Sequence, residues 1–542
     1  MTTPESTAGV GERPETASQP SPDSRGAELN APMTGSGLAG KSEESGSDHG
    51  LHDAWVPLIA GLIGSLLLLF GSVGIGWVGT SSVLWRNPVF TWMRVEPIGA
   101  ALSISSLAIG GMLLVRAWLR LGQRAKGWPP ASGRIVKQAI VLWGLPMMFA
   151  IPLFSRDVYA YIAQGRLVQA GVDPYLNGIS SVSNWFGLGA DKLWAEAPTP
   201  YGPVFLWIEQ AVVEISAGSP ELSVFLFRLT SVFGIVLCMI YVPRLAVLHG
   251  VNPHRALWLS VANPLLLVNF IAAVHNDALM IGLAVAGLYY CATKRGFLGV
   301  VLITLSIAVK PITVILLPFA GLLWAGKKAG WSRKFIFWGL TAALSLGLMA
   351  LMGWINGFGF GWINGLSAPG SVWIWYAPVG AIGLTVATVA GAFGWDGWGI
   401  AHGIWNVAKV VAIGLVAWLM FRGTYERIIR RMALAFAAVV LLAPMIQSWY
   451  VVWLIPLFAV TGIRNDWQVK SLYFILSFFM IYAISDQLNV YPYLQQRDAW
   501  LSLDNARIAA ALIGLGFALY IVLVDRKTRK LFLQDQQIRD VI

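Results

Sequence analysis

Long apolar segments recur along almost the whole chain after residue 53, and they limit its possible folds more than any other feature. Most of them approach the about 20 residues that a helix needs to cross the hydrocarbon core of a bilayer. The chain is 56% hydrophobic and 12% charged, whereas a soluble domain carries about 25% charged residues. This composition excludes a soluble enzyme and a disordered protein.

We therefore expect an all-α polytopic membrane protein with about 13–14 transmembrane helices. Fourteen segments are candidate spans: 55–75, 98–118, 136–154, 222–243, 255–274, 277–293, 296–310, 311–326, 335–354, 403–421, 432–448, 449–463, 470–486 and 506–525. Several are short, and Pro311, Pro444 and Pro456 interrupt the apolar runs, so the boundaries are approximate. No internal repeat is visible, which argues against a transporter built from inverted repeats.

The positions of lysine and arginine predict the orientation of the chain. Most of the 38 basic residues fall in short loops on one side, which the positive-inside rule assigns to the cytoplasm. We expect a multi-pass protein of the cytoplasmic (inner) membrane with both termini in the cytoplasm. In this topology the apolar segment 379–393 does not span, so it would form an outer-surface or re-entrant helix. The net charge of +11 does not indicate nucleic acid, because the basic residues lie in clusters between apolar runs.

This topology divides the chain into seven regions. Residues 1–53 carry nine acidic and three basic residues and little apolar surface, so we expect a disordered acidic cytoplasmic tail. The other regions are transmembrane helices in 54–154, an outer catalytic loop with an amphipathic helix in 155–221, transmembrane helices in 222–354, an outer loop with a surface or re-entrant helix in 355–402, transmembrane helices in 403–525, and a basic cytoplasmic tail in 526–542.

The sequence after the third candidate span carries the clearest chemical signal. It reads Ser155-Arg156-Asp157-Val158-Tyr159-Ala160-Tyr161 and continues through Arg166 to Asp173-Pro174-Tyr175 and Thr199-Pro200-Tyr201. A carboxylate beside an arginine at a membrane surface is costly unless it is paired or used. Asp157 either caps a helix that begins at Val158 or acts as a general base at the mouth of a cavity, with Arg156 or Arg166 binding an anion. The two roles are compatible.

This run of residues resembles the first outer loop of GT-C glycosyltransferases that use lipid-phosphate sugars. The most similar group is the polyprenol-phosphate-mannose-dependent α-(1→6)-mannosyltransferases of actinobacterial cell envelopes, the MptB-type enzymes. Many relatives place two adjacent acidic residues where this chain has Arg156-Asp157, which leaves Asp157 as the only matching base and argues against a paired-carboxylate metal site. The resemblance implies that Tyr161, Asp173, Tyr175 and Tyr201 contribute to substrate binding.

Three further groups fall in turns at the expected outer surface. His275-Asn276-Asp277 either satisfies a helix end and caps the next helix or binds sugar hydroxyls or the donor phosphate. Lys310 either reaches the membrane interface with its side chain or holds the donor phosphate as a point charge. The turn Gln447-Ser448-Trp449-Tyr450 resembles a turn of the same family and either anchors the interface or binds substrate.

Two cations, Arg228 and Lys409, lie within expected spans. A cation inside the membrane indicates a functional site that faces an interior cavity. Pairing with Glu209 or Glu214, in the expected amphipathic helix 204–217, is the structural alternative. Arg228 joins Arg156, Arg166 and Lys310 as a candidate ligand of the donor phosphate.

The resemblance implies an inverting glycosyltransferase at the outer face of the membrane. It would move mannose from polyprenyl-phosphate mannose to the 6-hydroxyl of a mannosylated glycolipid acceptor, building the α-(1→6)-mannan core of lipomannan-type glycolipids. Asp157 would accept the proton of that hydroxyl, and arginine and lysine would neutralise the departing phosphate. We therefore expect no cofactor and no obligatory metal, and we expect membrane lipids but no nucleic acid as partners.

Two other functions fit the same composition. A polytopic transporter or lipid flippase would also have many spans and intramembrane cations, but two long, aromatic-rich outer segments exceed what a pore needs. A GT-C enzyme of other sugar specificity, such as an arabinosyltransferase, cannot be separated by short loop motifs. The chain has no GxxxxGK[ST] motif and no Cys/His cluster with zinc spacing.

Overall fold

The computed structural model describes residues 53–365 and 372–533, and in these ranges every regular element is a helix. The expected all-α polytopic membrane architecture is confirmed. Residues 1–52, where we expected the disordered acidic tail, lie outside the described residues, as do 534–542 of the expected basic tail.

Seven helices of the described chain are long and apolar enough to cross a membrane on their own. They are α2 (Trp55–Ile75), α4 (Pro97–Arg124), α8 (Pro220–Leu248), α14 (Trp331–Ile355), α17 (Gly397–Phe421), α20 (Trp467–Asp486), and α22 (Leu503–Leu519) together with its π-helical end η9 (Tyr520–Val524). The helix α9 (Pro253–Ser260) and the segment Pro264–Ala272, which is α10 (Pro264–Leu267) followed by η4 (Val268–Ala272), make an eighth span if this pair, bent by 53°, is counted as one.

The other expected spans appear as helices shorter than a full crossing. They are α5 (Ser132–Met147), α11 (Asp277–Ala292), α12 (Gly296–Val309), η5 (Pro311–Leu316) with α13 (Leu317–Ala325), α18 (Ile428–Leu441) and α19 (Ser448–Thr461). Proline explains part of this shortening, because Pro311 opens a 3-10 turn and Pro444 lies in the break between α18 and α19. The expected count of 13–14 therefore includes segments that do not reach full bilayer length.

Short elements connect these helices. They are η1 (Val83–Arg86), α3 (Pro88–Val95), α6 (Asp157–Gln169), η2 (Ile179–Ser181), η3 (Lys192–Trp194), α7 (Pro203–Ile215), α15 (Trp362–Gly365), α16 (Pro378–Ala392), η7 (Tyr425–Arg427), α21 (Pro492–Arg497), η8 (Ala499–Leu501) and α23 (Lys530–Leu533). The expected amphipathic helix 204–217 corresponds to α7.

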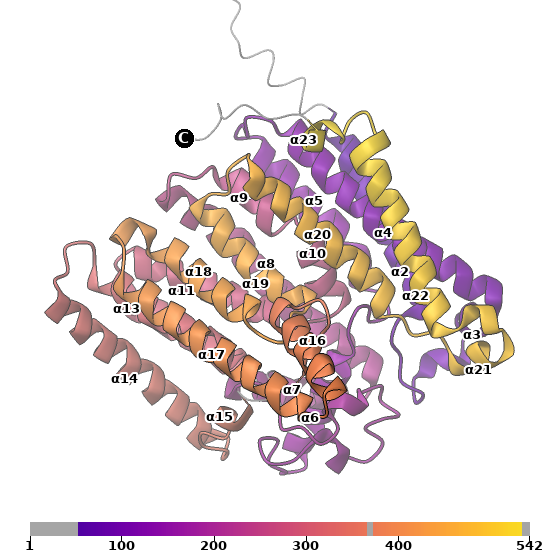
Figure 1. Ribbon diagram of the computed structural model, residues 1–542, viewed down its shortest axis with the longest axis horizontal. Helices are drawn as coiled ribbons and strands as arrows, with labels where there is room; N and C mark the ends of the chain where they lie inside the picture. Colours follow the sequence, from indigo (N-terminus) through magenta and orange to yellow (C-terminus); the bar gives the residue numbers. More distant parts are fainter. Residues whose placement is uncertain (1–52, 366–371, 534–542) are drawn as a thin grey trace, which may run out of the picture. The chain divides into compact units, whose positions relative to one another are not determined.

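The helices run up and down, so that their loops gather at two ends of the bundle (Figure 1). At one end, Arg116 pairs with Asp525 at 2.9 Å and Lys327 pairs with Glu426 at 2.6 Å. The expected outer loops lie at the other end, which we call the Asp157 end. This separation is what the positive-inside rule requires of the charges, while the side of the membrane that each end faces stays a prediction.

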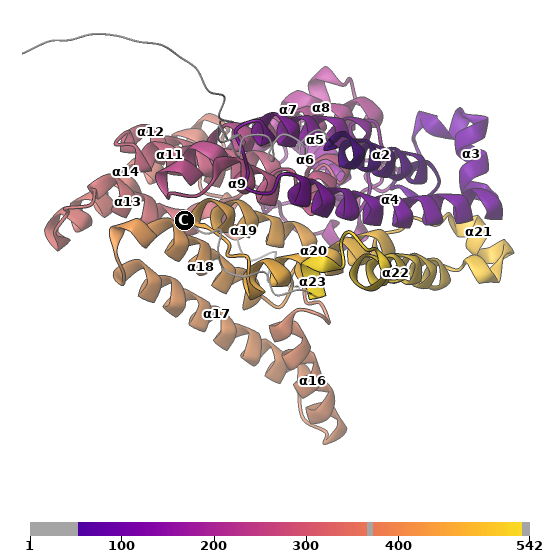
Figure 2. The same cartoon turned by 90° about the horizontal axis from the view of Figure 1, so that it is seen from above.

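The segment 379–393, expected not to span, is the helix α16. It packs on α17, where the Trp405 Nε1–H donates to the carbonyl of Val379 at 3.2 Å and the ring covers Gly383. Figure 2 shows α16 projecting from the bundle, while α17 also packs against α18. Only a small separate cluster of buried apolar side chains joins the two helices.

Candidate active site

The first expected site residue stands at the start of α6. Phe154 has a left-handed backbone (φ 66°) in the turn before the helix, and the N–H of Asp157 donates to Ser155 Oγ at 3.1 Å. Arg156 occupies the N-cap position and Asp157 is the first helical residue. The interpretation of Asp157 as the cap is therefore wrong by one residue. Its carboxylate, one-fifth exposed, is left to face a neighbouring turn.

That neighbouring turn joins η4 to α11. Val274 has a φ of 63° there, which is strained for a β-branched residue and is typical of functional sites. The N–H of Leu153 donates to the carbonyl of Ala272 at 3.2 Å and ties the two turns together. The fold thereby brings the 275–277 group to Asp157, although more than 100 residues separate them in the sequence.

His275 is fully buried between two carboxylates. Its Nδ1 lies 3.5 Å from Asp157 Oδ2 and 3.9 Å from Asp277 Oδ2. Its ring lies against that of Trp449, with 4.0 Å between the centroids. Neither ring nitrogen has a hydrogen-bond partner in the described chain, and the same is true of both side-chain polar atoms of buried Asn276. These unused donors and acceptors suit a substrate that carries hydroxyl groups.

Asp277 and Lys310 form a buried ion pair beside His275. Lys310 Nζ donates to Asp277 Oδ1 at 2.8 Å and to Oδ2 at 3.0 Å. The Trp453 Nε1–H donates to Asp277 Oδ1 at 2.6 Å. Asp277 is fully buried, whereas the Lys310 side chain is 12% exposed. Lys310 had no acidic neighbour in the sequence, so this pairing arises only from the packing of α11 against α12.

The electrostatics of the cluster leave one ionised base and one neutral imidazole at neutral pH. Burial raises the pKa of the Asp157 carboxyl to about 6, and Lys310 partly offsets that rise while Asp277 adds to it. Burial lowers the pKa of His275 well below its usual value, and the positive charge of Lys310 lowers it further. Asp157 is thus a carboxylate whose pKa lies close to neutrality, which suits a general base.

The expected tyrosines form a buried layer beneath this cluster. The ring of Tyr161, one turn after Asp157, meets that of Tyr201 edge to face at 5.3 Å. Lys310 Nζ lies 5.8 Å from the Tyr201 ring centroid. Tyr175 donates its hydroxyl to the Tyr201 carbonyl at 2.9 Å. The Asp173 side chain accepts the N–H of Tyr175 in a local turn at 2.8 Å, and it makes no hydrogen bond to Asp157.

The turn at the start of α19 completes the cluster. Trp449 contacts His275, and the ring of Tyr450 lies 4.3 Å from that of Trp453. Gln447 is the N-cap residue of α19, and its side chain makes no capping hydrogen bond. Trp453 was not among the expected site residues. A signal was available, because Trp453 follows Trp449 by four residues and so shares its helix face.

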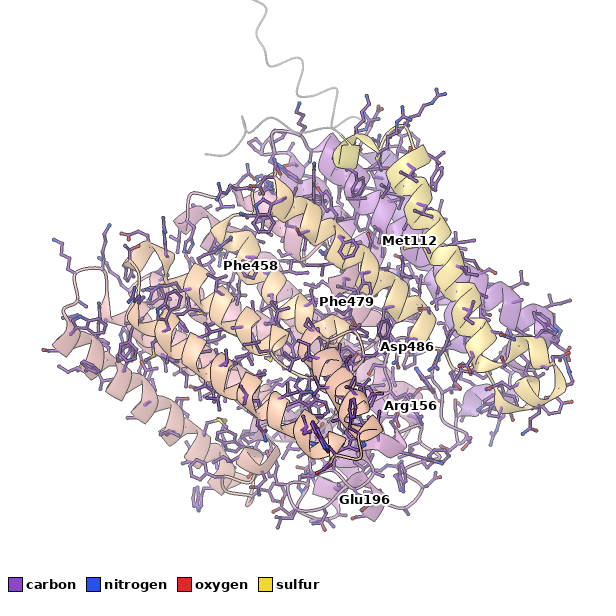
Figure 3. The ribbon with its side chains drawn as sticks, in the orientation of Figure 1. Met112, Arg156, Glu196, Phe458, Phe479 and Asp486 are labelled. Carbon is purple, nitrogen blue, oxygen red and sulfur yellow. The ribbon has the colours of Figure 1, made fainter. Side chains whose placement is uncertain are left out.

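The three expected phosphate-binding arginines are engaged elsewhere. Arg156 donates to the carbonyls of Gly189 at 2.8 Å and Ala190 at 2.6 Å and lies over the Trp77 ring. Figure 3 labels Arg156 and Glu196 in this segment, which was expected to be an outer loop. Arg166 lies nine residues after Asp157 in α6, which is about 14 Å along the helix. It donates to the Gly218 carbonyl at 3.3 Å. These contacts stabilise loops, so a role of either residue in donor binding stays a prediction.

Arg228 donates to the carbonyls of Ile271 at 3.0 Å, Met148 at 3.0 Å and Ala272 at 3.4 Å. The alternative that it pairs with Glu209 or Glu214 is wrong. Both carboxylate oxygens of Glu209 are buried without a hydrogen-bond partner in the described chain. Lys310 is consequently the cation whose charge acts on Asp157.

An apolar groove of about 450 Å³ lies between helices that also carry members of the cluster. Four helices line it with the residues Val204 and Ile208 of α7, Leu229, Thr230 and Phe233 of α8, Leu279 and Leu283 of α11, and Leu305 of α12. Leu279 and Leu305 line it from α11 and α12, the helices that also carry Asp277 and end at Lys310, but neither member of the ion pair lines the groove. Leu229 and Phe233 are 45% and 55% exposed, which opens the groove to the surroundings of the bundle.

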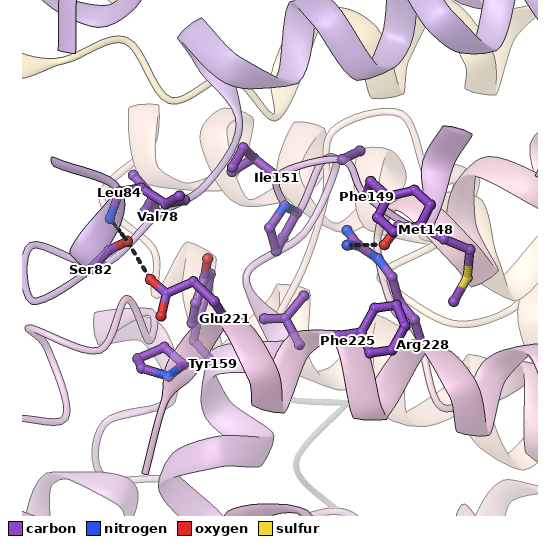
Figure 4. Close-up of a pocket in the computed structure, with 15 residues that line it drawn as sticks. Val78, Ser82, Leu84, Met148, Phe149, Ile151, Tyr159, Glu221, Phe225 and Arg228 are labelled. Atoms are coloured by element: carbon purple, nitrogen blue, oxygen red, sulfur yellow. Dashed lines mark hydrogen bonds between the residues drawn. The ribbon is translucent and has the colours of Figure 1, made fainter. Parts of the chain in front are cut away.

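A second cavity, of about 230 Å³, lies on another face of α8 (Figure 4). Its polar lining includes the hydroxyl of Ser82, which donates to the Glu221 carboxylate, and Arg228 at the other end of the cavity. Phe149 and Phe225 form much of its apolar wall. This cavity lies behind α6 relative to Asp157, because Tyr159 lines it and points away from the catalytic side of that helix.

A metal ion does not fit the cluster well. In residues 53–365 and 372–533, no group of three His, Cys, Asp or Glu side chains is placed to hold one. Lys310 and the indole of Trp453 already occupy the oxygens of Asp277.

The part of the chain that carries Asp157, His275 and Lys310 matches a known family. Residues 58–326 match the family model described as alpha-(1->6)-mannopyranosyltransferase, N-terminal domain. A probable alpha-(1->6)-mannopyranosyltransferase of Mycolicibacterium smegmatis is 32% identical over 441 residues, 74% of this chain and 78% of that protein. Alpha-(1->6)-mannopyranosyltransferase A of Mycobacterium tuberculosis is 31% identical, over 73% of this chain and 78% of its own length. The enzyme of that name in Corynebacterium glutamicum is 28% identical, over 72% of this chain and 85% of its own length. No solved structure matches the chain.

Proposed function

The chain belongs to the family of alpha-(1->6)-mannopyranosyltransferases, and on that premise we propose that Asp157, His275, Asp277 and Lys310 form its active site. The reaction is the transfer of mannose from polyprenyl-phosphate mannose to the 6-hydroxyl of a mannosylated lipid, with inversion at the anomeric carbon. The observation that carries this proposal is a partly exposed carboxylate, with a pKa of about 6, in one cluster with a buried histidine and a lysine–aspartate ion pair.

Asp157 is the base of this mechanism. It takes the proton of the acceptor hydroxyl while that oxygen attacks the anomeric carbon, and the bond between that carbon and the phosphate oxygen breaks. The electron pair of this bond leaves with the phosphate. A positioned base supplies a rate factor of about 100 to 10,000. When substrate binds, His275 Nδ1–H closes the 3.5 Å gap and donates to Asp157, while Nε2, which also has no partner among the described residues, holds the sugar.

Lys310 stabilises the leaving phosphate. Two of its three N–H groups bond to Asp277, which fixes the ammonium, and its partial exposure leaves the third for the donor. A preorganised cation in a poorly solvated site stabilises developing charge more than it would in water. With this cation in place we propose that the reaction needs no metal ion.

The apolar groove supports a lipid-linked donor. Its side-chain lining is entirely hydrocarbon apart from Thr230, and it opens at the exposed side of α8. We propose that a polyprenyl chain occupies this groove and that its phosphate extends to Lys310. Because lipid-phosphate sugars enter from the membrane, we propose that the Asp157 end faces the outer side of the cytoplasmic membrane, opposite the basic clusters.

The proposal is tested with purified protein in vesicles supplied with polyprenyl-phosphate mannose and a mannosylated lipid acceptor. Asp157→Asn should fold and insert but lose at least 100-fold in mannose transfer, because the amide cannot accept the proton. Asp504→Asn is the matched control, since the Asp504 side chain is 87% exposed in the first turn of α22. Linkage analysis of the product should give α-(1→6) bonds. Near wild-type transfer by Asp157→Asn would exclude Asp157 as the base.

A further inference from the structure

A lysine lies at the midpoint of a membrane span and faces outward. Lys409 is the thirteenth of the 25 residues of α17, so each end of the helix is about 18 Å away. Its side chain is exposed, and it has no hydrogen bond or ion pair with any described residue. The expectation that Lys409 faces an interior cavity is therefore wrong. A charge at this depth is costly unless a partner compensates it.

Lys409 belongs to a polar stripe along α17. His402, Asn406 and Lys409 follow one another by four and three residues, which places them on one face of the helix. All three are exposed. His402 Nδ1 bonds to the carbonyl of Trp398 on its own helix, at 2.8 Å, and its ring lies 5.0 Å from that of Trp405. The Asn406 side chain has no hydrogen-bond partner in the described chain. We call these three residues the α17 stripe.

The α17 stripe is distinct from the face that α17 uses to pack in the bundle. The buried residues Ala401, Trp405, Ala408 and Ala412 form the packing face, which contacts α16 and α18. Beyond the stripe, a side chain at Gly403 would meet no neighbouring atom. Polar side chains together with a small residue are the features by which helices associate within membranes.

The full-length spans of the described chain offer no partner for Lys409, because none of them carries a carboxylate at this depth. The acidic residues of these spans are Glu221, Asp486 and Asp504, each within two residues of a helix end. In a parallel two-fold dimer through this face, Lys409 would meet a second Lys409. Phosphates of lipids lie at the bilayer surface, too far from the midpoint.

We propose that the α17 stripe is the docking surface for a transmembrane helix of another protein that carries an aspartate or glutamate near its midpoint. The carboxylate pairs with Lys409, and polar side chains one and two turns away bond to Asn406 and His402. Figure 2 shows α17 apart from α6 and α11, the helices that carry Asp157 and Asp277, so docking does not require the active site.

The probe is a synthetic polyleucine transmembrane peptide with one glutamate at its midpoint, compared with the same peptide carrying leucine there. Binding to the labelled protein in vesicles is measured by energy transfer. The glutamate peptide should bind at least tenfold more tightly than the leucine peptide. Lys409→Leu should remove the difference while mannose transfer is kept. Val407→Leu, at a neighbouring exposed position, is the matched control and should preserve the difference.

Two results would overturn the proposal. One is equal binding of the two peptides to the wild-type protein, or discrimination that survives in Lys409→Leu. The other is a dimer of the wild-type protein in bilayers, counted by single-molecule photobleaching, that Lys409→Leu dissociates, because the occupant of the stripe would then be a second copy of this chain.

Discussion

His275 Nδ1 lies 3.5 Å from Asp157 Oδ2, and two turns with strained left-handed residues, Phe154 and Val274, hold this pair together. A neutral imidazole here can donate one N–H to the carboxylate and favour its ionised form. Its tautomer follows from the hydrogen bonds that form when substrate binds.

The first prediction follows from this pair. His275→Phe retains a ring against Trp449 but removes both nitrogens. We expect kcat to fall about 10- to 1,000-fold, because a general base that is no longer held in position loses much of the rate factor that it supplies. In the substrate complex we expect Nδ1–H to donate to Asp157, so the acid limb of kcat should also move to higher pH when this donor is removed. The pH profile of transfer by the variant measures this shift. A lower kcat with an unmoved acid limb would assign His275 to sugar binding alone.

The second prediction concerns the pH dependence of the wild-type enzyme. The pKa of Asp157 is raised to about 6, mainly by burial, and only the ionised form accepts a proton. We expect kcat/KM to be constant above about pH 7 and to fall tenfold per pH unit below about pH 6. His275 adds no second step in this window, because its pKa lies well below its usual value. A constant kcat/KM down to pH 5 would contradict the assignment of Asp157 as the base.

The third prediction separates the structural and chemical roles of Lys310. Lys310→Met leaves the buried carboxylate of Asp277 with only the Trp453 indole as a partner. Breaking one side of a buried ion pair costs about 3–5 kcal/mol of stability. The double variant Lys310→Met with Asp277→Leu should recover most of that loss, since no buried charge is left unpaired. Thermal unfolding measures the recovery, whereas mannose transfer should stay low in both variants. Recovered transfer in the double variant would remove Lys310 from the mechanism.

The fourth prediction concerns Glu209, whose carboxylate oxygens are buried without a partner in the described residues. Burial raises the pKa of Glu209 well above its usual value, so the folded state favours the protonated form. The protonated carboxyl stabilises the folded state fully below the pKa of about 4.5 that Glu209 has in the unfolded chain. This stabilisation is lost as the pH rises toward the pKa of Glu209 in the folded protein. Glu209→Gln should therefore gain stability relative to the wild type between pH 5 and pH 8. Unfolding of both proteins at pH 5 and at pH 8 tests this prediction. An equal difference in stability between variant and wild type at the two pH values would contradict it.

The sequence was sufficient for the fold class, because apolar runs of bilayer length and clustered basic residues report directly on a membrane protein. It also singled out Asp157, the 275–277 group, Lys310 and Trp449, which the structure brings together. It could not pair Lys310 with Asp277, which depends on the packing of α11 against α12. The hydrogen bonds of Arg228 to three carbonyls were equally hidden, because backbone partners leave no trace in residue types. The outward direction of Lys409 depends on which face of α17 packs.

The last prediction tests the groove as the site of the donor chain. Thr230 lines the groove from α8, and its hydroxyl bonds to the Phe227 carbonyl one turn earlier. Thr230→Trp fills part of the groove, so the KM for a long-chain polyprenyl-phosphate mannose should rise at least tenfold, while that for a short-chain donor changes little. The matched control is Thr388→Trp, because Thr388 makes the same kind of bond to its own helix and is exposed on α16. If Thr230→Trp raised both KM values equally, the groove would not distinguish chain length and the donor chain would have to bind elsewhere.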